Sequence, residues 1–190
     1  QRLCFTKGGL RVSNSNFDFN NTLISILKKY KNPNKWESSL FGEIKLISNT
    51  HVGSVGQDFI EELCKEFSFN YGFPMDSNGN RLKQSPWDIM IENITFELKT
   101  ASEDTGGCFQ FNHIRYHRNY DAVLCLGIAP NNIYFDVWTK ADIATNKAGR
   151  LVSMEKGANA SYKLTKSYSE LRDVSTFEDV MWEFIQNSNI

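Results

Sequence analysis

Apolar and polar residues alternate over residues 87–100, and this period of two predicts a β-hairpin. The alternation is interrupted at Glu92-Asn93, where it predicts a two-residue turn. One face of the hairpin is apolar throughout and belongs to a hydrophobic core; it carries Ile89, Ile91, Ile94, Phe96 and Leu98. The opposite face carries the charged residues of the segment.

The predicted turn places two acids opposite each other. It pairs Ile89 with Phe96 and therefore Asp88 with Glu97, with Cβ atoms about 4.5–5.5 Å apart. Two carboxylates at that distance repel each other unless a cation lies between them. A divalent metal ion is such a cation, and Lys99 lies two residues further along on the same face. The three charged residues fit metal-assisted phosphodiester hydrolysis, and a merely solvated polar face is the other interpretation.

The rest of the chain predicts helices around a sheet. Residues 20–30, 36–48, 57–67 and 177–187 have apolar residues at helical spacing, and residues 53–56 predict a break before the third of these helices. Residues 120–128 are an apolar run typical of a strand buried on both faces, and residues 133–138 predict a strand paired with it. No period is clear in residues 144–166. This order predicts an α/β (α+β) layered domain, with a central mixed β-sheet flanked by helices.

Length and composition limit the classes of protein. A chain of 190 residues suits one domain, residues 1–190, with an N-terminal helical part over about residues 1–56 and a basic loop region over about residues 144–168. The net charge of −1 does not by itself indicate a nucleic-acid binder, although a local basic surface can act beneath a neutral total. The four cysteines have no paired spacing, and we expect a reducing, cytoplasmic location. No apolar run approaches 18 residues, so we expect no membrane partner.

The hairpin motif resembles that of a known group of enzymes. Asp88, eight intervening residues and then Glu97-Leu98-Lys99 resemble the acid–acid–lysine motif of the PD-(D/E)xK nuclease superfamily. Residues 109–115, 120–128 and 133–140 resemble the type II restriction endonucleases of that superfamily. The resemblance covers about residues 40–143. It departs from the family pattern at Trp87, which separates Pro86 from the acid, so the literal Pro-Asp pair is absent.

The resemblance implies a restriction-endonuclease-like layered fold and a mechanism. Asp88 and Glu97 would bind Mg²⁺ together with the main-chain carbonyl of Leu98, which is a hard oxygen ligand. Lys99 would orient the attacking water or help to deprotonate it. The implied substrate is double-stranded DNA, and the implied products carry 5′-phosphates. Because a double-strand break requires two such sites, we expect a homodimer that acts on a palindromic target.

Further residues of the site are expected on neighbouring elements. In the family, the helix before the hairpin often supplies another carboxylate just after a glycine, and Gln57 follows Gly56 here. An amide can still hold a metal-bound water, and Glu61 and Glu62 are the carboxylates available on that helix; exposed helix glutamates are the competing interpretation. Gln110 follows the second loop, where the resemblance implies a role close to the site.

Basic residues beyond the hairpin are candidates for DNA binding. Arg115, His117 and Arg118 are expected to contact phosphates, with a solvated basic turn as the equal alternative. Residues 147–166 carry five basic residues against Glu155 alone. They predict a flexible loop, with Lys147 and Arg150 contacting DNA, or an ordinary mobile surface loop. Cys108, His113 and His117 also lie close together, but a fourth ligand at zinc-like spacing is missing.

Together these patterns favour a Mg²⁺-dependent endodeoxyribonuclease, specifically a type II restriction endonuclease. A structure-specific repair or recombination nuclease of the same superfamily is the alternative enzyme. A non-catalytic DNA-binding module with this fold is the alternative outside enzymes.

Overall fold

The computed structural model describes residues 4–6, 9–11, 18–31, 33–82, 84–157 and 160–188. The chain divides into two units, residues 1–35 and residues 36–190. The division falls at residue 35, whereas the sequence predicted that the N-terminal helical part ends at about residue 56. Within the described ranges, no helix is both long enough and apolar enough to cross a membrane.

The first unit contains a short hairpin and one helix. Strands β1 (Cys4–Thr6) and β2 (Gly9–Arg11) pair antiparallel. Helix α1 (Phe19–Tyr30) corresponds to the predicted helix at residues 20–30. It begins after Asp18, whose carboxylate accepts a hydrogen bond of 2.9 Å from the Asn21 N–H.

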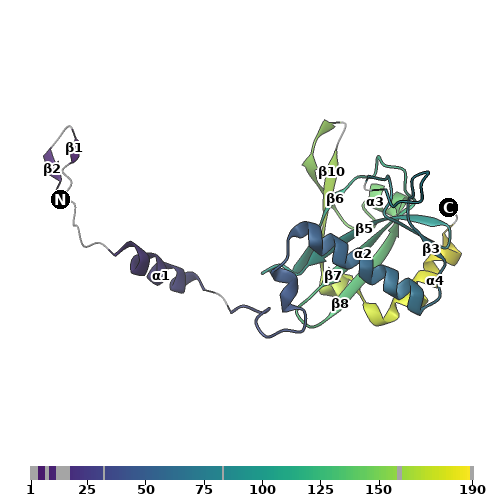
Figure 1. Ribbon diagram of the computed structural model, residues 1–190, viewed down its shortest axis with the longest axis horizontal. Helices are drawn as coiled ribbons and strands as arrows, with labels where there is room; N and C mark the ends of the chain where they lie inside the picture. The colour runs from purple at the N-terminus through teal and green to yellow at the C-terminus, as the bar shows by residue number, and fades with distance from the viewer. Residues whose placement is uncertain are drawn as a thin grey trace. The chain divides into compact units, whose positions relative to one another are not determined.

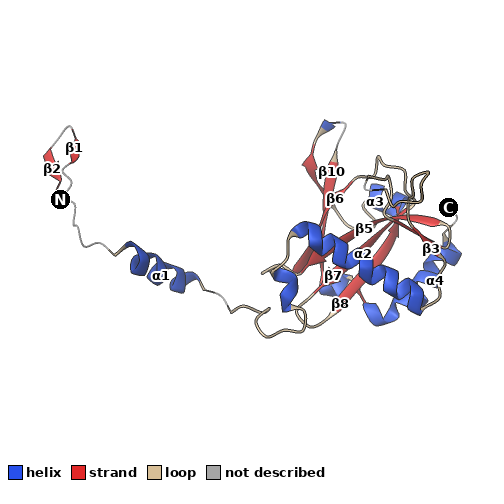
Figure 2. Ribbon diagram, viewed as in Figure 1, coloured by secondary structure: helices blue, strands red, loops and turns tan. Residues whose placement is uncertain are grey.

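The second unit is built on a six-stranded mixed sheet with the strand order β11-β8-β7-β5-β4-β3. Strands β3, β5, β7 and β8 of this sheet are labelled in Figures 1 and 2. Neighbours β5 and β7 are parallel, and the other pairs are antiparallel. The strands are β3 (Tyr71–Gly72), β4 (Ile89–Ile91), β5 (Ile94–Ser102), β7 (Ala122–Ile128), β8 (Ile133–Thr139) and β11 (Arg172–Asp173). All residues of β7 are buried, which confirms the prediction of a strand covered on both faces.

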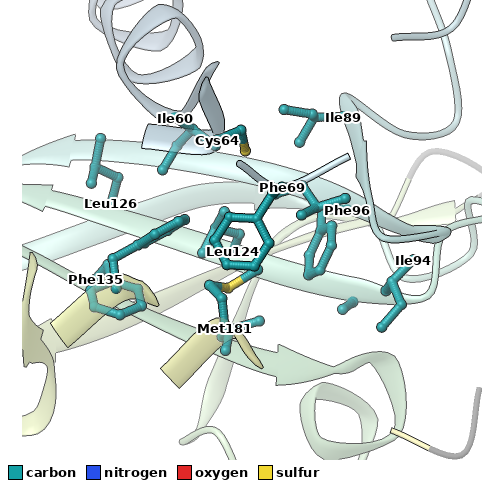
Figure 3. Packing of buried hydrophobic residues seen from close by; sticks show 14 residues of the cluster. Ile60, Cys64, Phe69, Ile89, Ile94, Phe96, Leu124, Leu126, Phe135 and Met181 are labelled. Carbon is teal, nitrogen blue, oxygen red and sulfur yellow. The ribbon is translucent and has the colours of Figure 1, made fainter. Parts of the chain in front are cut away.

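Two helices cover one face of this sheet. Helix α2 (Asn49–Glu66) contributes Ile60 and Cys64 to the main core, and helix α4 (Phe177–Asn187) contributes Met181 (Figure 3). These side chains pack against Phe96 and Leu124 of the sheet. Burial of this apolar surface is the main force that holds the helices on the sheet.

A second sheet and a short helix cover the opposite face. The sheet has the order β6-β10-β9 and consists of β6 (Cys108–Ile114), β10 (Ser161–Ser167) and β9 (Leu151–Glu155). Phe109 and Leu164 of this sheet share a second core with Val123 of β7 and with Ile143 of α3 (Lys140–Ala144). The central mixed sheet flanked by helices is therefore confirmed.

The sequence prediction was wrong in the segment before the hairpin. Residues 36–48 form turns and the 3₁₀ helix η1 (Gly42–Lys45) instead of an α-helix. Helix α2 starts at Asn49 and continues through residues 53–56, where a break was predicted. A Cβ atom on Gly56 would lie 1.8 Å from Oγ1 of Thr100 on β5. This glycine thus allows the helix to approach the sheet closely, and it does not end the helix.

The predicted basic loop was also largely wrong. Residues 151–155 and 161–167 are strands β9 and β10, which pair with each other, and β10 also pairs with β6. Leu164 lies fully buried in the second core, which ties this segment to the domain. Residues 158 and 159 of the predicted loop, and Asn32 after α1, lie outside the described residues. Two further 3₁₀ helices, η3 (Tyr168–Glu170) and η4 (Val174–Thr176), lead into α4.

The two glycines of α2 provide a matched test of this packing. Gly56→Ala should destabilise the protein by about 1–3 kcal/mol, because its new methyl group overlaps Thr100. Gly53→Ala has no atom within 4 Å of the new methyl group and should stabilise the helix by about 0.5–1 kcal/mol. Urea denaturation measures both free energies of unfolding. Equal effects of the two substitutions would contradict the close approach of α2 to β5.

Candidate active site

The β4–β5 hairpin has the register that the alternation predicts. Ile89 pairs with Phe96 and Ile91 with Ile94, so Glu92-Asn93 forms the two-residue turn. The φ angles of these turn residues are 47° and 67°, as a type I′ turn requires. Glu92 is held in this conformation because its Oε1 accepts a hydrogen bond of 2.7 Å from the Asn70 N–H. The prediction of a hairpin with this turn is confirmed.

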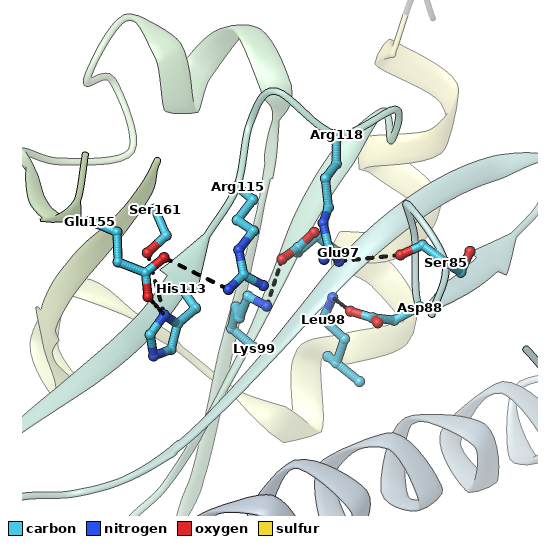
Figure 4. Close-up of polar contacts among 10 residues, drawn as sticks. All are labelled: Ser85, Asp88, Glu97, Leu98, Lys99, His113, Arg115, Arg118, Glu155 and Ser161. Atoms are coloured by element: carbon cyan, nitrogen blue, oxygen red, sulfur yellow. Dashed lines mark hydrogen bonds and ion pairs between the residues drawn. The ribbon is translucent and has the colours of Figure 1, made fainter. Parts of the chain in front are cut away.

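The register brings Asp88 across from Glu97. The Asp88 N–H donates to the Phe96 carbonyl at 2.8 Å, and the Asp88 Oδ2 accepts from the Leu98 N–H at 2.8 Å (Figure 4). The aspartate is therefore bound to β5 on both sides of Glu97. These bonds fix the side chain of Asp88 against the strand that carries the second acid.

Glu97 is a buried carboxylate with a lysine beside it. Only 2% of the residue is exposed, and the Lys99 Nζ lies 2.6 Å from its Oε1. Burial raises the pKa of the Glu97 carboxyl above its ordinary value, while Lys99 opposes this change. The charge of Asp88 raises the same pKa, and Arg118 lowers it. The two acids and the lysine therefore form one electrostatically coupled group.

The acids keep oxygen atoms available for a ligand. Within the described residues, the Oδ1 of Asp88 and the Oε2 of Glu97 have no hydrogen-bond or ion-pair partner. Carboxylate oxygens are the ligands that Mg²⁺ prefers. No group of three or more His, Cys, Asp or Glu side chains in the described ranges is placed to hold a metal ion. Cys108, His113 and His117 are among the described residues and form no such group.

A polar cavity of about 630 Å³ opens beside Asp88. Its basic lining residues include the three that were predicted as phosphate contacts, Arg115, His117 and Arg118, and also Lys156. Glu155 lines the same cavity, with its Oε2 3.9 Å from the Arg115 Nη2 (Figure 4). The Arg118 Nη1 donates to the Ser85 carbonyl at 3.2 Å. The fold thus places a cluster of positive charge directly beside one of the two acids.

Lys156 and Glu155 were not predicted as site residues. Glu155 is the last residue of β9, and Lys156 follows it. In the sequence, they stood out only as members of the basic segment 147–166. Their contact with the cavity depends on the pairing of β9 with β10 and of β10 with β6. Pairing between strands that are distant in the sequence cannot be predicted from a local sequence pattern.

Helix α2 reaches the site through Gln57. Its Nε2 donates to the Asp88 carbonyl at 3.3 Å, so the amide contacts the main chain of the acid. Glu61 lies one turn further along, 3.0 Å from the Lys65 Nζ, and accepts from the Tyr71 hydroxyl. The hydrogen bond from Lys65 holds the pKa of Glu61 below its ordinary value. Exposed Glu62 also pairs with Lys65, at 2.8 Å.

Three other predicted residues lie at different places in the domain. Gln110 is exposed on β6 and lines a cavity of about 400 Å³ together with Lys99. Lys147 lies 3.0 Å from Asp142 and lines a separate cavity with it. Arg150 is exposed just before β9. Contact of Lys147 and Arg150 with DNA stays a prediction.

Comparison with solved structures gives a distant structural likeness. No known family and no curated protein matches the chain. Among solved structures, the chain is similar to the bacterial homing endonuclease I-Ssp6803I, with a TM-score of 0.40 and 13% identity over 63% of this chain and 75% of that chain. A likeness of this extent assigns neither a family nor a function to the chain.

The coupling of Glu97 to Lys99 predicts a measurable titration. In the metal-free protein, Glu97 should titrate above the ordinary value of 4.5, and Lys99→Met should raise its pKa further because the ammonium that favours the carboxylate is lost. Carboxyl ¹³C NMR measures both values. Lys65→Met is the matched control: it should raise the pKa of Glu61 and leave that of Glu97 unchanged. A pKa of Glu97 at or below 4.5 in the wild type would contradict this account.

The raised pKa of Glu97 determines the direction in which the stability of the protein changes with pH. Because the folded-state pKa of Glu97 lies above its unfolded-state value, folding takes up a proton between the two values. The contribution of Glu97 to the free energy of unfolding is therefore largest below the unfolded-state pKa and is lost as pH rises through the folded-state pKa.

Proposed function

We propose that this protein is a Mg²⁺-dependent endonuclease that hydrolyses phosphodiester bonds of double-stranded DNA, as type II restriction endonucleases do. The observation that carries the proposal is the group formed by Asp88, Glu97 and Lys99. Glu97 lies on β5, and Asp88 directly precedes β4, which pairs with β5. Each acid keeps one oxygen without a partner among the described residues, and the Lys99 Nζ lies 2.6 Å from the other oxygen of Glu97. A fold has no structural need for a buried acid next to a second acid, because their mutual repulsion is destabilising.

Each residue of this group has a role in the proposed reaction. Asp88 and Glu97 would hold Mg²⁺ together with the main-chain carbonyl of Leu98. When bound, the metal ion supplies a Lewis acid for the scissile phosphate and lowers the pKa of a coordinated water. Lys99 orients the attacking water and offsets the negative charge that develops on the phosphate. Gln57 contacts the Asp88 main chain and positions that acid.

The basic cluster beside Asp88 fits the substrate. Arg115, His117, Arg118 and Lys156 line the same cavity as the acid, and a DNA backbone bound there would bring a phosphate to the acids. This local charge accounts for DNA binding by a chain whose net charge is only −1. A homodimer would place two such sites on the two strands of a palindromic target.

Cleavage of plasmid DNA in Mg²⁺ tests the proposal. We expect Asp88→Asn and Lys99→Ala to lower the cleavage rate by about 10²–10⁴-fold, because each removes a group that acts on the water or its metal. Lys65→Ala is the matched control, since Lys65 pairs with Glu61 and Glu62 on α2. Equal cleavage by wild type and Lys99→Ala would refute the mechanism. Discrete fragments with 5′-phosphate ends fit a restriction enzyme, whereas cutting only at junctions fits a repair nuclease.

The salt dependence of DNA binding tests the basic cluster separately. Arg115→Ala should weaken binding to every duplex sequence and reduce the slope of log K against log salt concentration by about 0.9, because one phosphate contact is lost. Fluorescence anisotropy without Mg²⁺ measures this slope without cleavage. Lys65→Ala should leave the slope unchanged. An unchanged slope for Arg115→Ala would show that the cavity beside Asp88 does not hold the backbone.

A further inference from the structure

Strand β6 has one buried face and one exposed polar face. Phe109 and Phe111 lie fully buried in the second core, and the residues that alternate with them, Gln110 and Asn112, are exposed. Gln110 pairs in register with exposed Thr165 on β10. The ribbon formed by β6 and β10 therefore presents amide and hydroxyl groups outward.

The pairing of this ribbon is interrupted at Asn112. Ile114 pairs with Tyr162 and Phe111 with Leu164, so two residues of β6 face the single residue Lys163 of β10. This is a β-bulge, which bends the strand and increases its twist. His113 adopts the left-handed region there, with φ 59°, and its Nδ1 lies 3.3 Å from the Ser161 hydroxyl (Figure 4).

The amide of Asn112 is unused within the described residues. It is exposed and makes no hydrogen bond to another described side chain or main-chain group, whereas the Gln110 Nε2 donates to Asp104 at 2.9 Å. The left-handed backbone conformation of His113, next to this asparagine, is costly in free energy for a non-glycine residue. Features of this kind re-aim side chains next to functional sites.

The exposed face adjoins the proposed active site. Lys99, Gln110, Asn112 and His113 line one cavity of about 400 Å³. A group bound by Asn112 therefore lies next to the lysine that would act on the scissile phosphate. This proximity matches the geometry of an enzyme that reads bases close to its cleavage point.

The dimensions and chemistry of the ribbon match the major groove of DNA. Strand β6 is an edge strand of the three-stranded sheet β6-β10-β9, and proteins that read DNA with β-strands place them in this groove. There the carboxamide of asparagine or glutamine pairs with adenine through two hydrogen bonds. Residues i and i+2 of a strand lie about 6.8 Å apart, which equals two base-pair steps of about 3.4 Å. Asn112 and Gln110 thus have the spacing to address positions two base pairs apart.

We propose that Asn112 is a specificity-determining residue, which reads an adenine in the major groove when the β6–β10 ribbon lies beside the scissile phosphate. This inference rests on the proposed function and names how the enzyme would select its site. Gln110, already bonded to Asp104, supplies the second contact two base pairs away.

Selection from a randomised duplex library tests this role. The full chain is bound to the library in Ca²⁺, so that binding is read without relying on cleavage. Wild type should enrich adenine at a fixed position, and Asn112→Ala should lower that preference by about 5- to 150-fold with other positions unchanged. Asn112→Asp should shift the same position towards cytosine, whose amino group a carboxylate accepts from. Gln186→Ala, an exposed amide on α4, is the matched control and should keep the wild-type preference.

The outcomes separate this inference from the proposed function. The inference is overturned if Asn112→Ala keeps the wild-type preference, if wild type binds duplex DNA without base preference, or if it binds no duplex. Plasmid cleavage lost in Lys99→Ala would then still support the nuclease. Conversely, a preference that depends on Asn112, in a wild-type protein that cuts no DNA, would support base reading and refute the nuclease.

Discussion

A carboxylate that is 2% exposed in the middle of a sheet must be stabilised by its neighbours, and the arrangement around Glu97 follows from this constraint. Lys99 lies two residues further along the same strand and pairs with it at 2.6 Å. Asp88 would repel this charge, yet its own Oδ2 is bound to the Leu98 N–H and is held in place. The hairpin register therefore fixes an unfavourable pair of acids, and a bound cation is the natural partner for both.

The two cores hold this hairpin from opposite sides. On one face, Gly56 lets α2 approach Thr100, which in turn brings Gln57 to the main chain of Asp88. On the other face, the second sheet carries β6 and the basic residues after it to the edge of the site. The site therefore lies on strand β5, which contacts both layers. Packing of the apolar side chains of β5 holds the polar side chains of the same strand in position.

Local patterns were sufficient to predict the hairpin that carries Asp88, Glu97 and Lys99. The alternation of residues 87–100 and the turn at Glu92-Asn93 correctly gave the pairing of Ile89 with Phe96, because side-chain period and turn length determine the register of a hairpin. Helix α4 and strand β7 were also predicted from local patterns, because the apolar residues of each follow a regular pattern along the whole element.

The remaining features depend on contacts between distant segments. Gly53 and Gly56 indicated a break, but packing against Thr100 makes the second glycine part of a continuous helix. Residues 151–167 show no clear period of two, because β9 is mostly exposed and the register of β10 is irregular, so the pairing of β10 with β6 and β9 was missed. The presence of Lys156 beside Asp88 follows from that pairing. Charge counts indicated a basic segment and did not indicate its position in space.

The central claim is that Asp88 and Glu97 together bind a divalent metal ion. Crystals soaked in Mn²⁺, a cation that also prefers carboxylate and carbonyl oxygens, allow the ion to be located by its anomalous scattering. The account predicts one anomalous peak bound by both carboxylates in the wild type and its loss in Asp88→Asn. A wild-type crystal without a peak at this pair, or with the ion bound elsewhere, would contradict it.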